Sequence, residues 1–577
     1  MSKNVVRINQ RYAGEEPSTL VKLRQVKARG GRITNEDIER IALETYVPKA
    51  FVYGVATFYD DLKFTPHGRY HVRVCQGTAC LASGCERTVR SLEQALGVKL
   101  GETSADGFAT LEPVYCLGLC NVSPSVRVND SVYGGMDEES VRALVDDLRA
   151  GGEPAESVPL ALGCTAEQPI VLRNLLGGGA PRLAEARVRG VYDALLFALA
   201  RMTPTQVIDQ VVASQLRGRG GAGFPTGTKW KVCAAEPATP KYVCCNGDEG
   251  DPGAYIDKYL MEQDPHSILE GMALCGFAIG AERGYVYVRA EYPAAIRSLA
   301  QAVEDASAAG LLGRNIQGSG FNFEVSVVEG AGSYICGEET AMLRSIEGVR
   351  GMVSARPPFP TQQGLYGKPT VVNNVETLQT VPWILANGGG AYAAIGHNRS
   401  RGTKAISLNE LFERPGLYEV PLGVTLRSIV EEIGGGLKEG RELKALQIGG
   451  PLGGIIPASL LDTRLGFEEL DAVGGLLGHG GIVAFDTSMD MREVARHLFF
   501  FCEQESCGKC FPCRIGSRRG VELAEKFLAG QGRQGDLQLL DDLCDTMRLG
   551  SLCAHGGGIP APIQSIMRHF REELLVS

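Results

Sequence analysis

The sequence predicts a multidomain α/β protein that ends in a helical bundle. Residues 241 to 400 alternate strand-like runs such as KYVCCN and FEVSVVEG with helical segments, which is typical of a parallel sheet covered by helices. A shorter alternation of strands and helices spans residues 69 to 149, and residues 488 to 577 are predicted to be helices around a cysteine-rich loop. At 577 residues the chain exceeds the size at which one core keeps growing, so three or more domains are expected.

Composition and net charge exclude several classes of protein. Charged residues make up 22 % and hydrophobic residues 44 % of the chain, which is ordinary for a globular protein. The net charge of −9 and the lack of a long basic run argue against a nucleic-acid or anionic-membrane surface. No apolar stretch approaches the length of a membrane span, and MSKNVVRINQRY lacks the apolar region of a signal peptide. We therefore expect a cytoplasmic protein with no membrane span.

The domains are expected in order along the chain. Leu20, Leu23 and Val26 have helical spacing ahead of the strand in RYHVRVCQGTAC, so a helical lead-in precedes the first α/β domain. AGGEPAESVP has the glycine, proline and alanine content of a linker. The expected segments are 1–150, the lead-in with the first α/β domain; 151–186, a linker; 187–402, the large α/β domain; 403–485, a small module of strands around one helix; and 486–577, the helical domain.

The loop CGKCFPC places three thiols, Cys507, Cys510 and Cys513, at two-residue intervals. This spacing lets one loop hold three corners of an iron-sulfur cubane while a distant cysteine supplies the fourth ligand. Cys553 is the candidate, because it lies in a glycine-rich turn that can approach a cluster closely. The spacing favours [4Fe-4S] over a four-cysteine zinc site, which commonly uses two C-x2-C pairs. Weaker candidates for the fourth ligand, interpreted as core thiols, are Cys502 and Cys544.

A second cysteine group lies in the first α/β domain and consists of Cys75, Cys80, Cys116 and Cys120. Two pairs on separate loops can each hold one iron of a [2Fe-2S] cluster. The same set is compatible with zinc, but the presence of a cubane loop in the same chain favours the two-iron cluster. Cys85 opens a predicted helix and is expected to be buried without binding metal. Seventeen cysteines without an export signal indicate a reducing compartment, where clustered thiols bind metal more often than they form disulfides.

The segment GRGGAG, residues 218–223, matches the pattern G-x-G-x-x-G. In a dinucleotide-binding fold this motif follows a strand, but the preceding TQVIDQVVASQL is predicted to be a helix, so the ordinary Rossmann interpretation loses weight. Successive glycines still let backbone N–H groups close on a phosphate or a flat ring, and Arg219 and Lys229 add positive charge. A flexible surface loop explains the glycines but not the following FPTGTKW.

Polar side chains follow two of the predicted strands. Ligands of parallel sheets bind beyond the carboxyl ends of the strands, so a site is expected there, with a solvated turn as the alternative. In VEGAGSYICGEET, a strand and glycines precede Glu338 and Glu339 at the start of a helix. Directly after the strand KYVCC come Asn246, Asp248, Glu249 and Asp251.

A family resemblance rests on five segments in a fixed order: RGRGGAGFPTGTKW, NGDEGDPGAYIDK, GAGSYICGEETAML, KPTVVNNVETL and ESCGKCFPCRIGS. They resemble the flavin-bearing, NADH-oxidising subunit of respiratory complex I and its soluble relatives, over about residues 187 to 570. Residues 18 to 150 resemble the thioredoxin-like two-iron subunit of the same systems. The resemblance implies a thioredoxin-like domain, a Rossmann-like FMN domain, a β-grasp module and a helical iron-sulfur domain.

The same resemblance implies four cofactors, namely FMN, NAD(H), [4Fe-4S] and [2Fe-2S]. No general base is implied, because the flavin takes the hydride while Glu249 and Lys229 orient the reactants. FMN is expected to be bound by Gly218, Arg219, Gly220, Lys229, Asn246, Asp248, Asn373, Asn374 and Thr377. NADH is expected to be contacted by Phe224, Lys229, Glu249, Tyr334, Glu339 and Phe359, with Asp251 and Glu338 as further cofactor-binding residues.

Fusion of the two-iron and flavin portions in one chain resembles the diaphorase subunit of soluble NAD-reducing nickel-iron hydrogenases. It implies a further iron-sulfur electron-transfer subunit and a hydrogenase catalytic module as partners. The flavin subunits of NAD-dependent formate dehydrogenases, with a formate dehydrogenase module as partner, and of complex I-type NADH dehydrogenases are alternatives. A non-catalytic electron-transfer or assembly scaffold is the alternative from another class.

Overall fold

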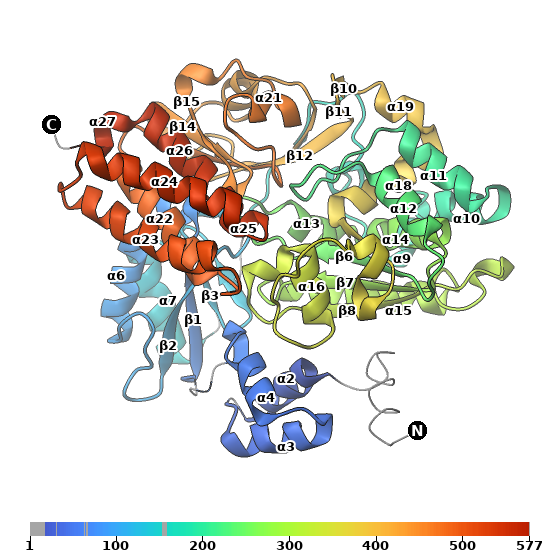
Figure 1. The fold of residues 1–577 in the computed structure, drawn as a ribbon, viewed down its shortest axis with the longest axis horizontal. Helices are drawn as coiled ribbons and strands as arrows, with labels where there is room; N and C mark the ends of the chain where they lie inside the picture. The colour runs from blue at the N-terminus through green and yellow to red at the C-terminus, as the bar shows by residue number, and fades with distance from the viewer. Residues whose placement is uncertain (1–17, 31, 63, 65–66, 153–157, 576–577) are drawn as a thin grey trace.

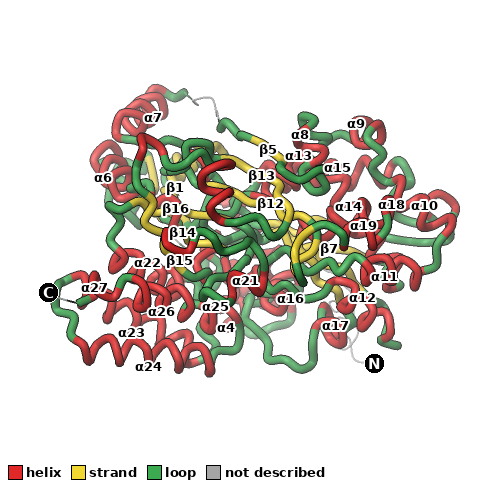
Figure 2. Tube along the Cα trace, turned by 90° about the horizontal axis from the view of Figure 1, so that it is seen from above, coloured by secondary structure: helices red, strands yellow, loops and turns green. Residues whose placement is uncertain are grey.

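The computed structural model describes residues 18–30, 32–62, 64, 67–152 and 158–575. Residues 1–17 of the expected lead-in and residues 153–157 of the expected linker lie outside this described part. The described strands form sheets of four, four, six and two strands. Figure 2 shows the strands gathered in the middle of the molecule, with helices around them. The chain is thus a mixed α/β protein with a helical C-terminal region (Figure 1), which confirms the predicted fold class.

A parallel sheet with strand order β8-β7-β6-β9 forms the centre of the expected large domain. Successive residues of β6 face opposite sides of the sheet. Val243 and Cys245 pack into the core with α14 and α18, whereas Tyr242 and Cys244 pack into the core on the other face with α16. Both faces are therefore covered. The elements are β6 (Tyr242–Gly247), β7 (Arg283–Val288), β8 (Glu324–Glu329), β9 (Thr370–Asn374), α12 (Thr226–Ala235), α13 (Ile256–Gln263), α14 (Pro265–Ile279), α15 (Pro293–Ala308), α16 (Glu339–Ile346) and α18 (Val375–Asn387).

The lead-in helices complete the α16 side of this sheet. Leu23 and Val52, which are fully buried, belong to one core with Leu343 of α16. The hydroxyl of Tyr59 donates a hydrogen bond to the carbonyl of Val349, at 2.7 Å. The amphipathic lead-in therefore buries its apolar face on the parallel sheet domain. Its helices are α2 (Thr19–Gly30), α3 (Asn35–Thr45) and α4 (Lys49–Ala56).

The first α/β domain has a four-stranded sheet in the order β2-β1-β3-β4. β1 and β2 are parallel, and β3 and β4 are antiparallel additions at one side. Leu92 of α6 and Val141 of α7 pack into the same core as Val72 of β1. Both iron-ligand loops predicted for this domain follow β1 and β2. The elements are β1 (Tyr70–Cys75), α5 (Thr78–Ala82), α6 (Cys85–Leu96), β2 (Ala109–Val114), β3 (Val126–Val128), β4 (Ser131–Tyr133) and α7 (Glu138–Ala150).

A six-stranded mixed sheet with the order β15-β14-β16-β12-β13-β5 follows the parallel sheet. Its edge strand β5 comes from residues expected to be a linker, and it pairs with β13 through Leu162 and Leu417. Three residues are too few to show a strand period in the sequence, so this pairing was not predicted. The strands are β5 (Leu162–Cys164), β12 (Thr403–Leu408), β13 (Gly416–Pro421), β14 (Leu443–Ile448), β15 (Ile455–Pro457) and β16 (Gly481–Asp486).

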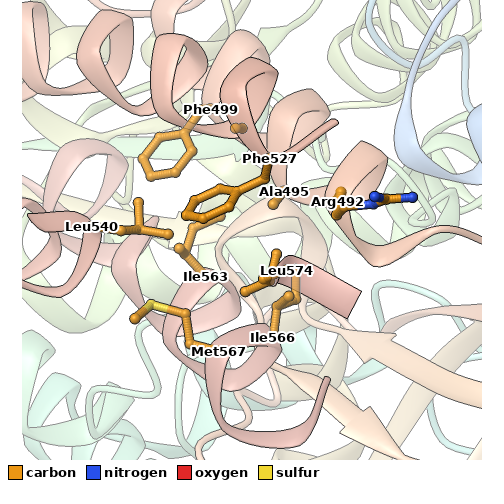
Figure 3. A pocket seen from close by; sticks show the side chains of 10 residues that line it. Arg492, Ala495, Phe499, Phe527, Leu540, Ile563, Ile566, Met567 and Leu574 are labelled. Atoms are coloured by element: carbon orange, nitrogen blue, oxygen red, sulfur yellow. The ribbon is translucent and has the colours of Figure 1, made fainter. Parts of the chain in front are cut away.

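The C-terminal helices form a bundle that carries the cubane loop between its first two members (Figure 1). Figure 3 shows apolar side chains, including Phe499, Phe527 and Ile563, pointing together into a small void in this bundle. The one charged residue at its edge, Arg492, is paired with Asp490, so the void is a packing feature. The helices are α22 (Met491–Gln504), α23 (Phe511–Leu528), α24 (Gln534–Gly550), α25 (Ala554–Gly558), α26 (Pro560–His569) and α27 (Arg571–Leu574).

Shorter elements connect these bodies. They are α8 (Arg173–Leu176), α9 (Leu183–Val188), α10 (Asp193–Arg201), α11 (Pro204–Ala213), α17 (Pro360–Gln363), α19 (Gly389–Ala393), β10 (Gly396–His397), β11 (Ser400–Arg401), α20 (Leu426–Ser428) and α21 (Phe467–Asp471). Among the helices of the described residues, none combines the length and apolar character that a bilayer crossing requires.

A buried ion pair joins the six-stranded sheet to a helix that packs on the parallel sheet. Lys404 of β12 and Glu376 of α18 are both fully inaccessible to solvent, and Lys404 Nζ donates to a carboxylate oxygen of Glu376. The other carboxylate oxygen accepts the backbone N–H of Ala405 at 3.0 Å. We expect Lys404→Met to lower the free energy of unfolding by about 3–5 kcal/mol, because it leaves a buried charge unpaired.

Chemical denaturation with matched variants checks this expectation. Replacing both partners, as in Lys404→Met with Glu376→Leu, should recover most of the loss. The exposed pair of Lys49 and Glu39 is the control, and Lys49→Met should cost at most about 1 kcal/mol. Equal effects of Lys404→Met and Lys49→Met would contradict the role assigned to the buried pair.

Candidate functional site

The glycine loop at residues 218–223 follows α11 rather than a strand, as the sequence predicts. A Cβ added at Gly220 would lie 2.9 Å from Cβ of Asn374, closer than side-chain contacts allow. Gly221, at φ +115°, forms a backbone bridge with Gly478 of the loop before β16. Glycine is therefore required for the loop to lie between the carboxyl edge of the parallel sheet and the six-stranded sheet.

Arg219 anchors the glycine loop through both its backbone and its side chain. Its backbone N–H donates to Thr377 Oγ1 at 2.8 Å, and its guanidinium donates to the hydroxyl of Tyr392 and the carbonyl of Arg401. Only 1 % of Arg219 is exposed, and its Nε and Nη1 have no hydrogen-bond partner among the described residues. A buried cation with free donors fits an anionic cofactor beside the loop.

The predicted polar residues gather at the carboxyl ends of β6 and β9. These strands are neighbours in parallel register, so Asn246 lies opposite Asn374. Asn246 donates to the carbonyl of Gly337 at 2.8 Å and accepts from the backbone N–H of Asp248 at 3.1 Å. Burial raises the pKa of Asp248 well above its usual range, and its Oδ2 has no partner in the described part of the chain. The set offers hydrogen-bonding groups that fit a cofactor such as FMN.

Asn373 and Asn374 are held by neighbours on both sides of β9. Trp230 Nε1 donates to Asn373 Oδ1 at 2.8 Å. Asn374 Oδ1 accepts the N–H of Thr377 at 3.3 Å and so caps α18, while its amide donates to Asp257 at 2.6 Å. These contacts fix both side chains in one orientation.

An open face lies beside this edge. Phe224 and Phe359 are 50 % and 52 % exposed. Lys229 Nζ lies 6.0 Å from the ring centroid of Phe224 and 3.6 Å from a carboxylate oxygen of Glu339. It also donates to the carbonyl of Val372. Exposed aromatic rings beside a lysine and a carboxylate can stack on a flat ring and bind ribose or phosphate groups.

Arg356 was missed by the sequence analysis. Its guanidinium lies 2.7 Å from an oxygen of Glu339 and 3.6 Å from an oxygen of Glu338. Glu338 also accepts the N–H groups of Thr340 and Ala341 at the start of α16. A single arginine in ARPPFP carries no spacing signal, and only the fold brings it to the two glutamates. It adds a second cation to the open face.

Glu249 and Asp251 are not part of this open face. Only 2 % of Glu249 is exposed, and its carboxylate accepts the N–H groups of Ile256, Asp257 and Lys258 at the start of α13. Asp251 accepts from the hydroxyl of Tyr334 at 2.6 Å, and burial raises its pKa. The expected contact of Glu249 with NADH therefore stays a prediction, although the residue occupies the loop where it was expected.

Three of the predicted cubane cysteines surround the start of α23, and Cys553 lies at the start of α25. A Cβ added at Gly556 would lie 2.5 Å from Cβ of Cys513, so the two loops are in direct contact. Cys507 and Cys553 pack against the core formed by Ile335, Ala341 and Val353. The four-cysteine donor set fits an iron-sulfur cluster. The site borders the segment that contains Tyr334 and Glu339.

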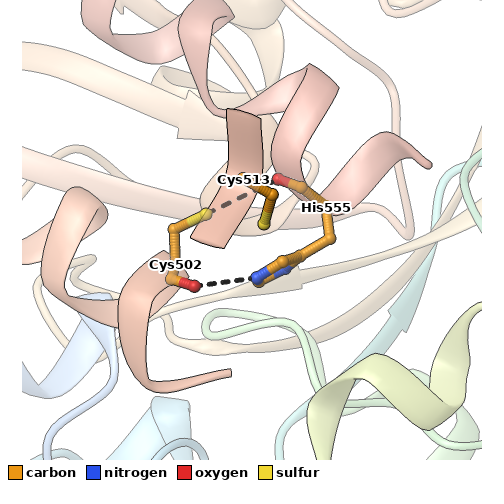
Figure 4. A group of neighbouring side chains, drawn as sticks. All are labelled: Cys502, Cys513 and His555. Carbon is orange, nitrogen blue, oxygen red and sulfur yellow. Dashed lines mark hydrogen bonds between the residues drawn. The ribbon is translucent and has the colours of Figure 1, made fainter. Parts of the chain in front are cut away.

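Cys502 lies close to Cys513 and His555 (Figure 4). Its thiol donates to the carbonyl of His555 at 3.8 Å, and His555 Nε2 lies 3.0 Å from the carbonyl of Cys502. A hydrogen bond from Cys502, ahead of the opposing effect of burial, lowers the pKa of the Cys513 thiol to about 7. Cys502 and Cys544 are both fully buried in helices, in agreement with their interpretation as core thiols.

The second cysteine group is buried as a unit. Cys116 Sγ and Cys120 Sγ are 3.6 Å apart, and a hydrogen bond from Cys80 lowers the pKa of Cys75 to about 6. The N–H of Gly253 lies 3.3 Å from Cys120 Sγ, so the loop after β6 contacts this site directly. Cys85 is buried at the start of α6, as expected, and burial raises the pKa of its thiol to about 12.

Three family models match the chain. They describe a thioredoxin-like [2Fe-2S] ferredoxin over residues 5–149, the Nuo51 FMN-binding domain over residues 211–383, and the NADH-ubiquinone oxidoreductase-F iron-sulfur binding region over residues 493–576. These matches confirm the prediction of FMN, NAD(H), [2Fe-2S] and [4Fe-4S] as cofactors.

Relatives cover the whole chain. The NAD-reducing hydrogenase HoxS subunit alpha of Cupriavidus necator is 33 % identical over 577 residues, which is 99 % of this chain and 94 % of that protein. A subunit of NADH-quinone oxidoreductase from Rhizobium meliloti is 45 % identical over 71 % of this chain and 97 % of that protein. A crystal structure of NAD+-reducing [NiFe]-hydrogenase in the H2-reduced state has a TM-score of 0.85 at 30 % identity, covering 97 % of this chain and 92 % of that one. The chain therefore belongs to the family of NAD-linked oxidoreductase subunits with FMN and iron-sulfur clusters, which includes both of these relatives.

Proposed function

We propose that the chain is the diaphorase module of a cytoplasmic NAD-reducing hydrogenase, in which it exchanges a hydride with NAD(H) and single electrons with iron-sulfur clusters. The observation that carries this proposal is the position of the segment from Tyr334 to Ala341, which has contacts at both expected sites. Tyr334 bonds to Asp251 in the loop after β6, and Glu339 belongs to the open face. Its buried side chains Ile335 and Ala341 contact Cys507 and Cys553 of the cubane site. One short segment thus contacts both the proposed site of hydride exchange and the proposed site of electron exit.

In this proposal the glycine loop and the carboxyl ends of β6 and β9 bind FMN. The free donors of Arg219 and the amides of Asn373 and Asn374 orient it, and Thr377 holds the loop through the N–H of Arg219. Bound FMN supplies the conversion between a two-electron hydride and single electrons, and the protein supplies orientation and electrostatics. Asp248, whose raised pKa favours the protonated form, offers a hydrogen-bond donor there.

The open face is proposed to bind NADH. Phe224 and Phe359 stack on the planar rings, while Lys229 and Arg356 face the pyrophosphate and Glu339 accepts from ribose hydroxyls. The lysine and the arginine are each paired with Glu339, which keeps both side chains in place before the dinucleotide binds.

The cubane site is proposed to pass electrons to a further iron-sulfur subunit that leads to a hydrogenase module. Cys507, Cys510 and Cys553 are only half-buried, which brings this site near the surface. An apolar rim lies beside it, formed by Phe511, which follows Cys510, by Leu552, which precedes Cys553, and by Leu549, and these side chains are 66 %, 41 % and 83 % exposed. Exposed apolar clusters of this kind mark interaction sites. A hydrogenase is favoured as the terminal module, because the hydrogenase relative matches 99 % of the chain.

The open face is tested by Phe359→Ala in the chain reconstituted anaerobically with FMN, iron and sulfide. Stacking of a base on an aromatic side chain contributes about 1–3 kcal/mol, so KM for NADH should rise about tenfold in NADH-dependent ferricyanide reduction. The control is Phe197→Ala on α10, which removes a ring of similar exposure, 55 %. A chain that binds FMN but reduces no dye would favour the non-catalytic scaffold instead.

The rim is tested by Leu549→Glu. We expect the variant to lose hydrogen-dependent NAD reduction when combined with its partner subunits, because a charge enters the apolar contact, while NADH-dependent dye reduction stays unchanged. Leu43→Glu, at a leucine that is 76 % exposed on α3, is the control. Normal hydrogen-dependent activity of Leu549→Glu would rule out the rim as the docking surface.

A further inference from the structure

A buried cluster of charges lies behind the glycine loop. His479, in the loop before β16, places its Nε2 2.9 Å from Oδ2 of Asp257 and 3.3 Å from Oε1 of Glu249. All three residues are buried. Two of them belong to the loop after β6 and to α13, whereas the histidine comes from the six-stranded sheet.

This cluster contacts the proposed flavin site along two routes. Asp257 Oδ2 accepts from the amide of Asn374, whose Cβ faces Gly220. Gly478, the residue before His479, bridges to Gly221 in the same glycine loop. The histidine and the glycine loop are therefore held in fixed relation to each other by backbone and side-chain contacts.

His479 is the basic residue of the cluster. Burial alone lowers the pKa of His479, but the carboxylates of Asp257 and Glu249 outweigh it and raise the value to about 9. Burial, together with the charge of Asp257, raises the pKa of Glu249 to about 7. The other charged groups nearby already have partners. Lys404 is paired with Glu376, Lys258 with Glu262 and Arg289 with Glu291, and Asp251 is bonded to Tyr334. At neutral pH the imidazolium thus offsets the charge of Asp257 and the ionised fraction of Glu249.

We propose that His479 is a positioning residue whose positive charge sets the reduction potential of the flavin bound at the glycine loop. The inference rests on the proposed function, since it needs FMN at that loop. Reduction adds negative charge there, and in a water-poor interior uncompensated carboxylate charge opposes this addition. The imidazolium compensates this carboxylate charge, and it keeps the carboxylate of Asp257 in its hydrogen bond with Asn374. The loop before β16 therefore acts on the flavin through the charge of His479.

The experiment measures the FMN midpoint potential of the reconstituted full chain by anaerobic spectroelectrochemistry. His479→Gln should weaken binding of reduced FMN about tenfold more than that of oxidised FMN. For a two-electron couple this ratio corresponds to a potential lower by about 30 mV. An unchanged potential in His479→Gln would overturn the inference.

A second variant separates charge from structure. Adding Asp257→Asn to His479→Gln removes one negative charge while keeping an oxygen acceptor for Asn374, so the potential should return toward that of the unmodified chain. A merely structural role predicts that the double variant departs further, and this result would also overturn the inference. His266→Gln is the control, because His266 is equally buried but contacts Tyr192 on the far side of the sheet domain.

A third variant covers the case in which His479→Gln does not fold. Glu249→Gln removes a negative charge from the same cluster and keeps an acceptor for the start of α13, so it should raise the potential. A lowered or unchanged potential in Glu249→Gln counts against the charge balance. Failure of the unmodified chain to bind FMN is a different result, because it overturns the proposed function itself.

Discussion

The close approach of Gly220 to Asn374 is the constraint on which the site depends. No side chain fits between them, so the glycine loop lies directly on the carboxyl edge of β9. Thr377 then receives the N–H of Arg219, and the buried guanidinium faces inward with free donors. A loop displaced by one methyl group would lose these contacts together. The preceding element need not be a strand, because a helix such as α11 delivers the loop to the same edge.

The chain places its redox sites around shared segments instead of joining separate domains by linkers. The loop after β6 carries Glu249, reaches Cys120 of the two-iron site through Gly253, and leads into α13 beside His479. The segment that starts at Tyr334 links the open face to the cubane cysteines. Buried carboxylates in these segments are held by helix starts, by a tyrosine and by one histidine. Cofactor binding and the transfer of electrons out of the chain therefore depend on packing between the three parts of the molecule that contain the large sheets.

Features with a periodic or spacing signal could be predicted from the sequence. The parallel sheet follows from strand–helix alternation, and the helix before the glycine loop follows from apolar spacing. Cys553 was found because few cysteines stand in a glycine-rich turn. By contrast, Arg356 and His479 are single residues that only the fold brings to their carboxylates, and β5 is too short to show a period. Glu249 was predicted for the right loop, but its burial at the start of α13 depends on backbone geometry that no motif encodes.

The most direct test of the account is the FMN content of Gly220→Ala. Its added methyl group lies 2.9 Å from Cβ of Asn374, whereas one at Gly390 on α19 meets open space, so Gly390→Ala is the matched control. Both variants are reconstituted and assayed for FMN released on denaturation and for iron and sulfide. The account predicts that Gly220→Ala keeps its clusters and loses most of its FMN, while the control keeps both. Normal FMN affinity in Gly220→Ala would contradict the placement of the flavin at this loop.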